Sequence, residues 1–181
     1  MTPDGRYGVS GGPGDLKFWD LPTGQEVRSF ELNVRPKGTT DSDWQEWKKF
    51  SIRFSVAADC RHGVSGDSDG TIKVWDLSNG AELGSFAAHK SDVRSISISA
   101  DGRYAISGGC FSYDEDKICE AGSLKLWEVT AGKQLHEFLG HAGFVETAVI
   151  APDARFALSS SEKTLKLWDL SEWTHLPKAR P

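Results

Sequence analysis

Hydrophobic and polar residues alternate in the same way at four places along the chain. Each place runs through an aliphatic residue, a lysine, an apolar residue, a tryptophan and an acid, at residues 16–20, 72–76, 124–128 and 165–169. Alternation with a period of two over about six residues, rich in β-branched and aromatic side chains, predicts a β-strand. Four copies in 181 residues indicate a repeat protein.

The surroundings of each tryptophan strand repeat as well. A turn with the pattern Asp-x-Arg begins at residues 4, 59, 101 and 153, and a short strand follows it at 7–10, 62–65, 104–107 and 156–159. After the tryptophan strand, Gly24, Gly80 and Gly132 occupy a turn position that favours positive φ, and a further strand follows. An apolar strand precedes the Asp-x-Arg turn at 93–99 and 145–151, with a weaker one at 51–57. Each unit is therefore four short antiparallel strands, here named a to d.

The spacing of the tryptophans shows where the repeat is interrupted. Trp19, Trp75, Trp127 and Trp168 lie 56, 52 and 41 residues apart. The last spacing matches the roughly 40–45 residues of a four-stranded propeller blade. The two longer spacings predict one insertion at 31–46, between strands d and a, and another at 110–121, between strands b and c.

Composition excludes several classes of function. The net charge is −5 and basic residues do not cluster, which argues against a nucleic-acid surface. No apolar run approaches the roughly 20 residues of a membrane span, and the first residues lack the pattern of a secretion signal. Three cysteines are too few for a disulfide scaffold, so we expect a reducing, cytoplasmic location.

The chain resembles the WD-repeat β-propeller family. The resemblance rests on three Trp-Asp strand ends, the Trp127-Glu128 variant, and Gly140-His141 at the start of a repeat. It implies an all-β fold of about four WD-type blades, each of four antiparallel strands, arranged as an incomplete or open arc. The expected divisions are blade 1 at 1–30 without strand a, the insertion at 31–46, blade 2 at 47–86, blade 3 at 87–138 with the insertion at 110–121, and blade 4 at 139–181. Because the family usually closes with seven blades, we expect a piece of a longer protein, with pairing between chains or unusual four-blade closure as the alternatives.

In this family a histidine, a serine or threonine, an aspartate and the tryptophan form a buried hydrogen-bonded set in each blade, and such groups are costly to bury without partners. The resemblance assigns this structural role to Trp19, Trp75, Trp127, Trp168, His89, His141, Ser65, Ser107, Ser159 and Asp69. No set is complete, since Ala121 and Glu162 stand where blades 3 and 4 should carry aspartate, and Trp47 where blade 2 should carry histidine. We therefore expect tryptophan and aliphatic packing to matter more than the polar set.

The serine and histidine residues also invite a hydrolase interpretation, which we reject. A catalytic triad needs an exposed nucleophile, an orienting acid and an oxyanion site in one cleft, whereas these residues recur once per blade beside a tryptophan. The sequence offers no metal-ligand set and no cofactor motif, and residues 114–116 lack calcium-loop spacing. Cys110 and Cys119 flank the second insertion and could form a disulfide or be buried small hydrophobes, and the expected compartment argues against the disulfide.

The two insertions are the expected functional region. Strand order sends d–a and b–c loops to the same rim, so the insertions should lie side by side. They carry aromatic and acidic residues suited to a basic protein or peptide: Trp44, Trp47, Phe111, Tyr113, Asp114, Glu115 and Asp116. Trp47 could equally cap blade 2 in place of the missing histidine. The sequence predicts a non-enzymatic interaction scaffold that could also self-associate or be completed by further blades; the alternative is a regulatory module of an enzyme encoded elsewhere.

Overall fold

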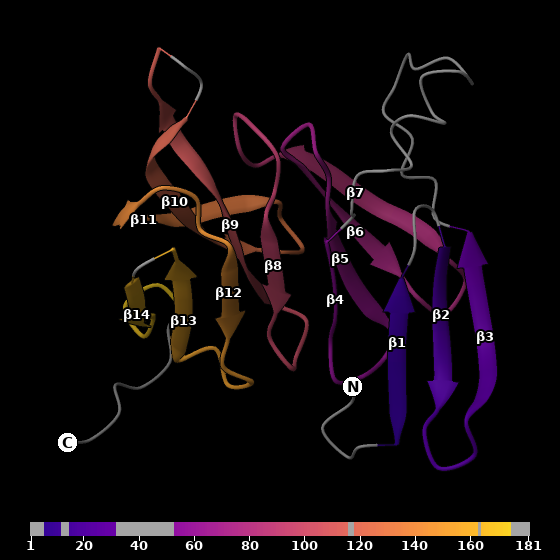
Figure 1. The fold of residues 1–181 in the computed structure, drawn as a ribbon. Coiled ribbons are helices and arrows are strands. Elements are labelled where there is room, and N and C mark those ends of the chain that lie inside the picture. The colour runs from indigo at the N-terminus through magenta and orange to yellow at the C-terminus, as the bar shows by residue number, and fades with distance from the viewer. Residues whose placement is uncertain (1–5, 12–14, 32–52, 116–117, 163, 175–181) are drawn as a thin grey trace.

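The computed structural model describes residues 6–11, 15–31, 53–115, 118–162 and 164–174, and in these residues the fold contains strands and no helix (Figure 1). The strands are β1 (Tyr7–Gly11), β2 (Asp15–Asp20), β3 (Gln25–Glu31), β4 (Arg53–Val56), β5 (His62–Gly66), β6 (Thr71–Asp76), β7 (Ala81–Ala87), β8 (Ser95–Ile98), β9 (Tyr104–Tyr113), β10 (Cys119–Glu128), β11 (Lys133–Ala142), β12 (Thr147–Ile150), β13 (Phe156–Ser161) and β14 (Thr164–Asp169).

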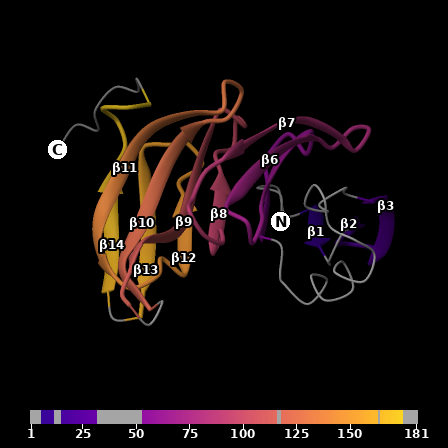
Figure 2. The same cartoon turned by 90° about the horizontal axis from the view of Figure 1, so that it is seen from above.

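These strands form four antiparallel sheets, each a meander in chain order. The first sheet is β1–β2–β3, the second β4–β5–β6–β7, the third β8–β9–β10–β11 and the fourth β12–β13–β14. The inner strands β4, β8 and β12 contact one another in succession, and seen from above the sheets follow an open arc (Figure 2). The predicted all-β propeller arc is therefore confirmed.

A register shift recurs at one place in three sheets. Strands c and d slip by one residue just before the tryptophan, between Phe18 and Trp19, between Val74 and Trp75, and between Leu126 and Trp127. A β-bulge of this kind increases the local twist of the strand pair. Because the shift falls at the same place in the three sheets, equivalent residues of the outer strands β3, β7 and β11 can be compared directly.

The second insertion continues the sheet instead of forming a loop. β9 and β10 are ten residues long, whereas β5 and β6 in the second sheet have five and six. Their pairing runs through Gly122 opposite Cys110 and Ala121 opposite Ser112 to Cys119 opposite Tyr113. The result is a β-hairpin that projects beyond the sheet (Figure 1). The first insertion lies almost entirely at residues 32–52, outside the described residues.

The core lies between neighbouring sheets. One buried cluster joins the second sheet to the third and includes Val64, Ile72, Val74, Ile96, Ile98, Ala105 and Trp127. Another joins the third sheet to the fourth and includes Ile106, Leu124, Leu126, Val145, Ala148, Ile150 and Ala157. Burying one such aliphatic side chain contributes about 1.5–3 kcal/mol, so packing between sheets dominates the stability.

The inner strands are also linked by side-chain hydrogen bonds. The amide of Ile98 in β8 donates to the hydroxyl of Ser55 in β4 at 3.1 Å, and the amide of Ile150 in β12 donates to Ser97 in β8 at 3.2 Å. Ser55 and Ser97 hold the same position in their strands. The second sheet is therefore attached to the third, and the third to the fourth, by the same polar contact.

The fourth sheet exposes a face that is buried in its neighbour. Leu158, Leu165 and Leu167 are 42%, 68% and 69% exposed. Their counterparts in the third sheet, Ile106, Leu124 and Leu126, are fully buried. The exposed face of the fourth sheet therefore carries the kind of residues that are buried between sheets elsewhere in the fold.

Candidate functional site

Each of the four sheets contains a hydrogen bond between its tryptophan and a serine of the neighbouring strand. The indole Nε1–H donates to the serine hydroxyl at 2.8–3.0 Å in the pairs Trp19–Ser10, Trp75–Ser65, Trp127–Ser107 and Trp168–Ser159. The pair in the first sheet is exposed, whereas Ser65, Ser107 and Ser159 are fully buried. The tryptophan–serine part of the expected polar set is therefore present in all four sheets.

Histidines extend the set in the third and fourth sheets. The Nε2 atom of His89 lies 2.8 Å from the Ser107 hydroxyl, and that of His141 lies 2.7 Å from the Ser159 hydroxyl. Burial lowers the pKa of His89 to about 3, with the charge of Lys125 acting in the same direction. His89 is consequently neutral at pH 7 and can share a proton with Ser107 without a buried charge.

The position expected to hold aspartate is filled differently in the fourth sheet. The Nδ1 atom of His141 lies 2.7 Å from the Thr164 hydroxyl and 3.2 Å from the Ser161 hydroxyl, while Glu162 is exposed. Hydroxyl groups one or two residues away thus replace the carboxylate. In the third sheet His89 Nδ1 has no hydrogen-bond partner in the described part of the chain.

In the second sheet the structure distinguishes two aspartates. Asp69 is exposed and accepts the Thr71 amide at 2.9 Å within the β5–β6 turn. Asp67 is the buried acid, with Oδ2 3.9 Å from the Lys73 ammonium and Oδ1 without a partner among the described residues. Burial raises the pKa of Asp67 to about 6 despite the opposing charge of Lys73. This acid was not among the residues singled out from the sequence, because the other units carry glycine or serine at its position.

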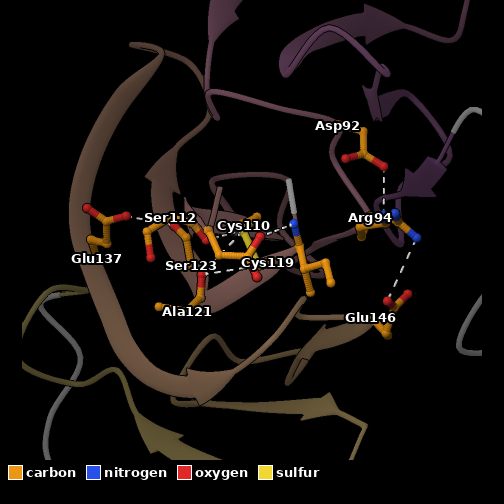
Figure 3. The surroundings of a disulfide bond; sticks show 11 residues. Asp92, Arg94, Cys110, Ser112, Cys119, Ala121, Ser123, Glu137 and Glu146 are labelled. Atoms are coloured by element: carbon orange, nitrogen blue, oxygen red, sulfur yellow. Dashed lines mark hydrogen bonds and ion pairs between the residues drawn. A yellow bond between two sulfur atoms is a disulfide. The ribbon is translucent and has the colours of Figure 1, made fainter. Parts of the chain in front are cut away.

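The root of the projecting hairpin is closed by a disulfide between Cys110 and Cys119 (Figure 3). The expectation against this bond was wrong. The extended strands place the two Cα atoms 5.9 Å apart, within the 4.4–6.8 Å that disulfides span. That proximity depends on strand pairing and could not be judged from the spacing of two cysteines. Cys60, the third cysteine of the chain, is not part of this bond.

Alkylation will check the disulfide directly. Iodoacetamide added to the unfolded, unreduced protein should modify Cys60 alone, because the other two sulfurs carry no thiolate. The same treatment after reduction should modify all three cysteines, as read by intact mass. Three modifications without reductant would contradict the bond.

The hairpin presents two exposed aromatic rings. Phe111 is 43% and Tyr113 is 38% exposed, and Glu115 at the tip is also exposed. Asp114 has a structural part, because its carboxylate accepts the Ile118 amide at 2.7 Å and closes the turn. Asp116, Trp44 and Trp47 lie outside the described residues, so their part in this surface stays a prediction.

Residues that the sequence did not single out complete this surface. Phe144, between β11 and β12, meets the Tyr113 ring edge-on at 6.0 Å, and the Arg94 guanidinium lies 4.2 Å above the Phe144 ring. Lys90 lies 6.0 Å from the Phe111 ring. We call Lys90, Arg94, Phe111, Tyr113 and Phe144 the hairpin face. Their sequence positions differ by up to 54 residues, so only the fold brings them together.

The charge of the hairpin face is mixed. Arg94 contacts Asp92 at 2.6 Å and Glu146 at 3.8 Å, as Figure 3 shows. The carboxylates of Asp92 and Glu146 therefore neutralise the Arg94 guanidinium, which lies at the centre of the hairpin face. Polar groups around an aromatic centre are typical of protein interaction surfaces.

Comparison with known families decides the classification. The model of the family "WD domain, G-beta repeat" matches residues 50–76, 80–128 and 132–169. The chain belongs to the WD40 repeat family. The matched segments include three of the four tryptophan strands and the complete hairpin.

Several WD40 proteins are similar to the chain. It is 30% identical over 142 residues to nuclear distribution protein nudF of Emericella nidulans, an alignment covering 66% of this chain and 30% of that protein. It is 29% identical to small ribosomal subunit protein RACK1y of Oryza sativa subsp. japonica, covering 100% of this chain and 62% of that one. The solved structure of U3-55K superposes with a TM-score of 0.67 at 17% identity, over 96% of this chain and 48% of that chain. The WD40 chain thus spans less than two thirds of each of these proteins.

The described residues contain neither a metal-ligand cluster nor a membrane-spanning helix. Within the described ranges, no group of three or more His, Cys, Asp or Glu side chains could hold a metal ion. The same residues include no helix long and apolar enough to cross a membrane.

Proposed function

We propose that this WD40 chain is a non-enzymatic scaffold that binds a protein or peptide through the hairpin face. The observation that carries the proposal is the pair of half-exposed rings, Phe111 and Tyr113, on a disulfide-closed hairpin beside Phe144. Large aromatic side chains supply much of the binding energy at protein interfaces. A rigid hairpin also reduces the entropy lost when a partner binds.

Burial of the serine and histidine residues supports a scaffold over an enzyme. Ser107 is fully buried between Trp127 and His89, so no substrate reaches its hydroxyl. A nucleophile must be accessible in a cleft that also holds the other catalytic groups. One relative supports a binding role, since it is named serine-threonine kinase receptor-associated protein, from Gallus gallus, and is 29% identical over 65% of this chain.

The first insertion is proposed to enlarge the same face. From the strand order we expect the connection at residues 31–46 to reach the rim that carries the hairpin, where Trp44 and Trp47 would add aromatic area. Glu115, together with Asp114 and Asp116, would favour a partner with basic residues. We further propose a cytoplasmic location, where thiols are generally kept reduced. In that compartment the Cys110–Cys119 bond would form only when the two thiols are oxidised, and the pairing of β9 with β10 would hold the hairpin without it.

The exposed leucines of the fourth sheet support association as a second property. A face with the composition of an inter-sheet core favours another sheet as its cover, from a second copy or from further blades. This property is independent of the hairpin face, which lies at a rim and not on a sheet face.

Alanine substitutions test the hairpin face. Phe111→Ala and Tyr113→Ala should each weaken the binding of a captured partner by more than about 1 kcal/mol, because each removes exposed aromatic contact area. The double variant should lose less than the sum if both rings touch one group. Partners would be captured from lysate, and the dissociation constant of each would be measured by isothermal titration calorimetry.

The matched controls are Asn79→Ala and Lys133→Ala, which alter exposed turns at the opposite rim. These variants should bind as the unchanged chain does. A partner that ignores both hairpin substitutions yet is weakened by either control would place binding at the other rim and refute the proposal.

A further inference from the structure

A pocket of ≈ 330 Å³ lies between the second and third sheets, at the rim opposite the hairpin. Its walls are Val74 of β6, Leu83 and Phe86 of β7, and Val129 in the turn after β10. His62 and Gly102 stand at one end. Ligand pockets span about 300–1,000 Å³, so this one suits a single long side chain. Leu83 is 57% exposed, so the pocket is open to solvent.

The corresponding space between the first and second sheets is filled by Arg28. Arg28 lies opposite Phe18 in the β2–β3 register, and its guanidinium stands 4.6 Å from the Phe18 ring. Its Nη2 donates to the carbonyl of Cys60, in the turn that leads into β5, at 3.1 Å. One arginine therefore stacks on the floor of the groove and binds a carbonyl of the next sheet.

The corresponding space between the third and fourth sheets is filled by aromatic rings. His136 lies opposite Leu126 in the β10–β11 register, the same position as Arg28. Its ring stacks on Trp173 at 4.1 Å and meets Phe138 at 4.6 Å. Two of the three grooves are thus closed by the chain's own side chains.

The second sheet has glycine at this position. Gly84 lies opposite Val74, and a Cβ built on it meets nothing within 4 Å. A side chain at Gly84 that pointed as those of Arg28 and His136 do would therefore enter free space above Val74. The pocket exists because this one outer strand lacks the side chain that fills its two counterparts.

The carbonyl acceptor used by Arg28 also has a counterpart in the pocket. Cys60 and Gly102 occupy the same place in the Asp-x-Arg turns, and both have positive φ, at 54° and 72°. Their amides donate to the residue three positions earlier, Ala57 and Ser99, at 3.1 and 3.0 Å. Because the turns share this geometry, the Gly102 carbonyl holds the position of the Cys60 carbonyl.

Two carboxylates lie next to His62, one of the lining residues of the pocket. His62 Nδ1 lies 2.7 Å from the Asp59 carboxylate, and Asp76 lies opposite His62 in the β5–β6 register. Burial alone would raise the pKa of Asp59, but hydrogen bonds from the Arg61 amide and from His62 outweigh it, so this pKa is lowered. Asp59 is therefore an anion at pH 7. Arg103, the cation of the adjoining turn, is directed onto the Tyr104 ring.

We propose that the pocket at Gly84 binds an arginine side chain from a partner protein, in the manner in which Arg28 fills the first groove. The aliphatic stem would lie along Val74 and Leu83, with the guanidinium facing the Phe86 ring and the Gly102 carbonyl. A planar guanidinium both stacks on aromatic rings and donates several hydrogen bonds, which a lysine ammonium does not reproduce. The pocket is separate from the hairpin face, so either proposal can fail alone.

Three capped amino acids test the assignment on the unchanged chain. N-acetyl-arginine methylamide should give saturable NMR shifts at the Gly84, Gly102 and Gly132 amides, with a dissociation constant on the order of 1 mM for so small a probe. The lysine analogue should bind at least about tenfold more weakly. If the tryptophan analogue binds more tightly than the arginine analogue, or if no probe shifts these amides, the arginine assignment is wrong.

Two substitutions at one residue supply the control. Gly84→Arg places a tethered guanidinium in the pocket and should abolish the arginine shifts, while Gly84→Ala adds a methyl group that takes up only part of this space and should weaken binding less than Gly84→Arg does. Arginine binding that survives Gly84→Arg at full strength would overturn the proposal. The NMR spectrum of each variant reports its folding, and the comparison of probes needs no variant.

Discussion

Replacing Ser107 with alanine is expected to lower the free energy of unfolding by about 3 kcal/mol. The Ser107 hydroxyl is fully buried and meets two buried groups, the indole N–H of Trp127 at 2.9 Å and Nε2 of His89 at 2.8 Å. Alanine leaves both without that partner, and each unsatisfied buried group costs about 1–3 kcal/mol. Urea denaturation followed by tryptophan fluorescence measures the loss.

Ser10→Ala is the matched control for this substitution. Ser10 accepts the same bond from Trp19 at 2.8 Å, but the pair is exposed, so water can replace the hydroxyl. Its loss should stay within about 0.5 kcal/mol, as for other surface substitutions. Equal losses at the two positions would show that burial does not set the cost. Hydrolysis of an ester substrate that disappears in Ser107→Ala would refute the scaffold proposal itself.

Acid should destabilise the fold through His89 by about 3 kcal/mol between pH 6.5 and pH 4. The folded pKa is about 3 and the unfolded value about 6.5, so within this interval the unfolded chain binds a proton that the folded chain does not. Stability therefore falls as the pH drops from 6.5 towards 3. Burial also lowers the pKa of His141, which adds in the same direction.

Asp67 opposes this effect and provides the test. Its folded pKa of about 6 exceeds the usual 3.8, so the ionised form costs stability above pH 6 and the cost disappears as the pH falls to 4. Asp67→Asn should therefore be more stable than the unchanged chain by about 2–3 kcal/mol at pH 7, with no advantage at pH 4. The urea midpoints of the variant and of the unchanged chain, measured at pH 7 and at pH 4, test this prediction. Parallel pH profiles would contradict the burial of an ionisable Asp67.

Much of the fold followed from the sequence because its determinants are local. Six-residue alternation, the Asp-x-Arg turns and the glycine turns are short-range signals, and their repetition predicted the order of the strands within each sheet. The tryptophan and serine partners were also visible, since they occupy fixed places in neighbouring strands. Features that depend on a single strand and its adjoining turns were therefore predictable from the sequence.

The remaining features depend on which strands pair and with what register. The ten-residue pairing of β9 with β10 turned the second insertion into a hairpin and brought Cys110 to Cys119. Phe144 and Arg94 joined the hairpin face through loops of other strands. Thr164 took the place expected for a carboxylate because a hydroxyl could reach His141 from a nearby position. The spacing of motifs along the chain does not determine these contacts between different strands.

The serine links between inner strands mean that the sheets are not interchangeable modules. Ser55 and Ser97 each accept an amide of the following sheet, whereas the same position in β12 is Val149, which has no acceptor. A rearranged gene that placed the fourth sheet before the third would set the Ile98 amide against an isopropyl group. Although the units share one pattern, this single position distinguishes the fourth sheet, which could not precede another sheet without losing the link.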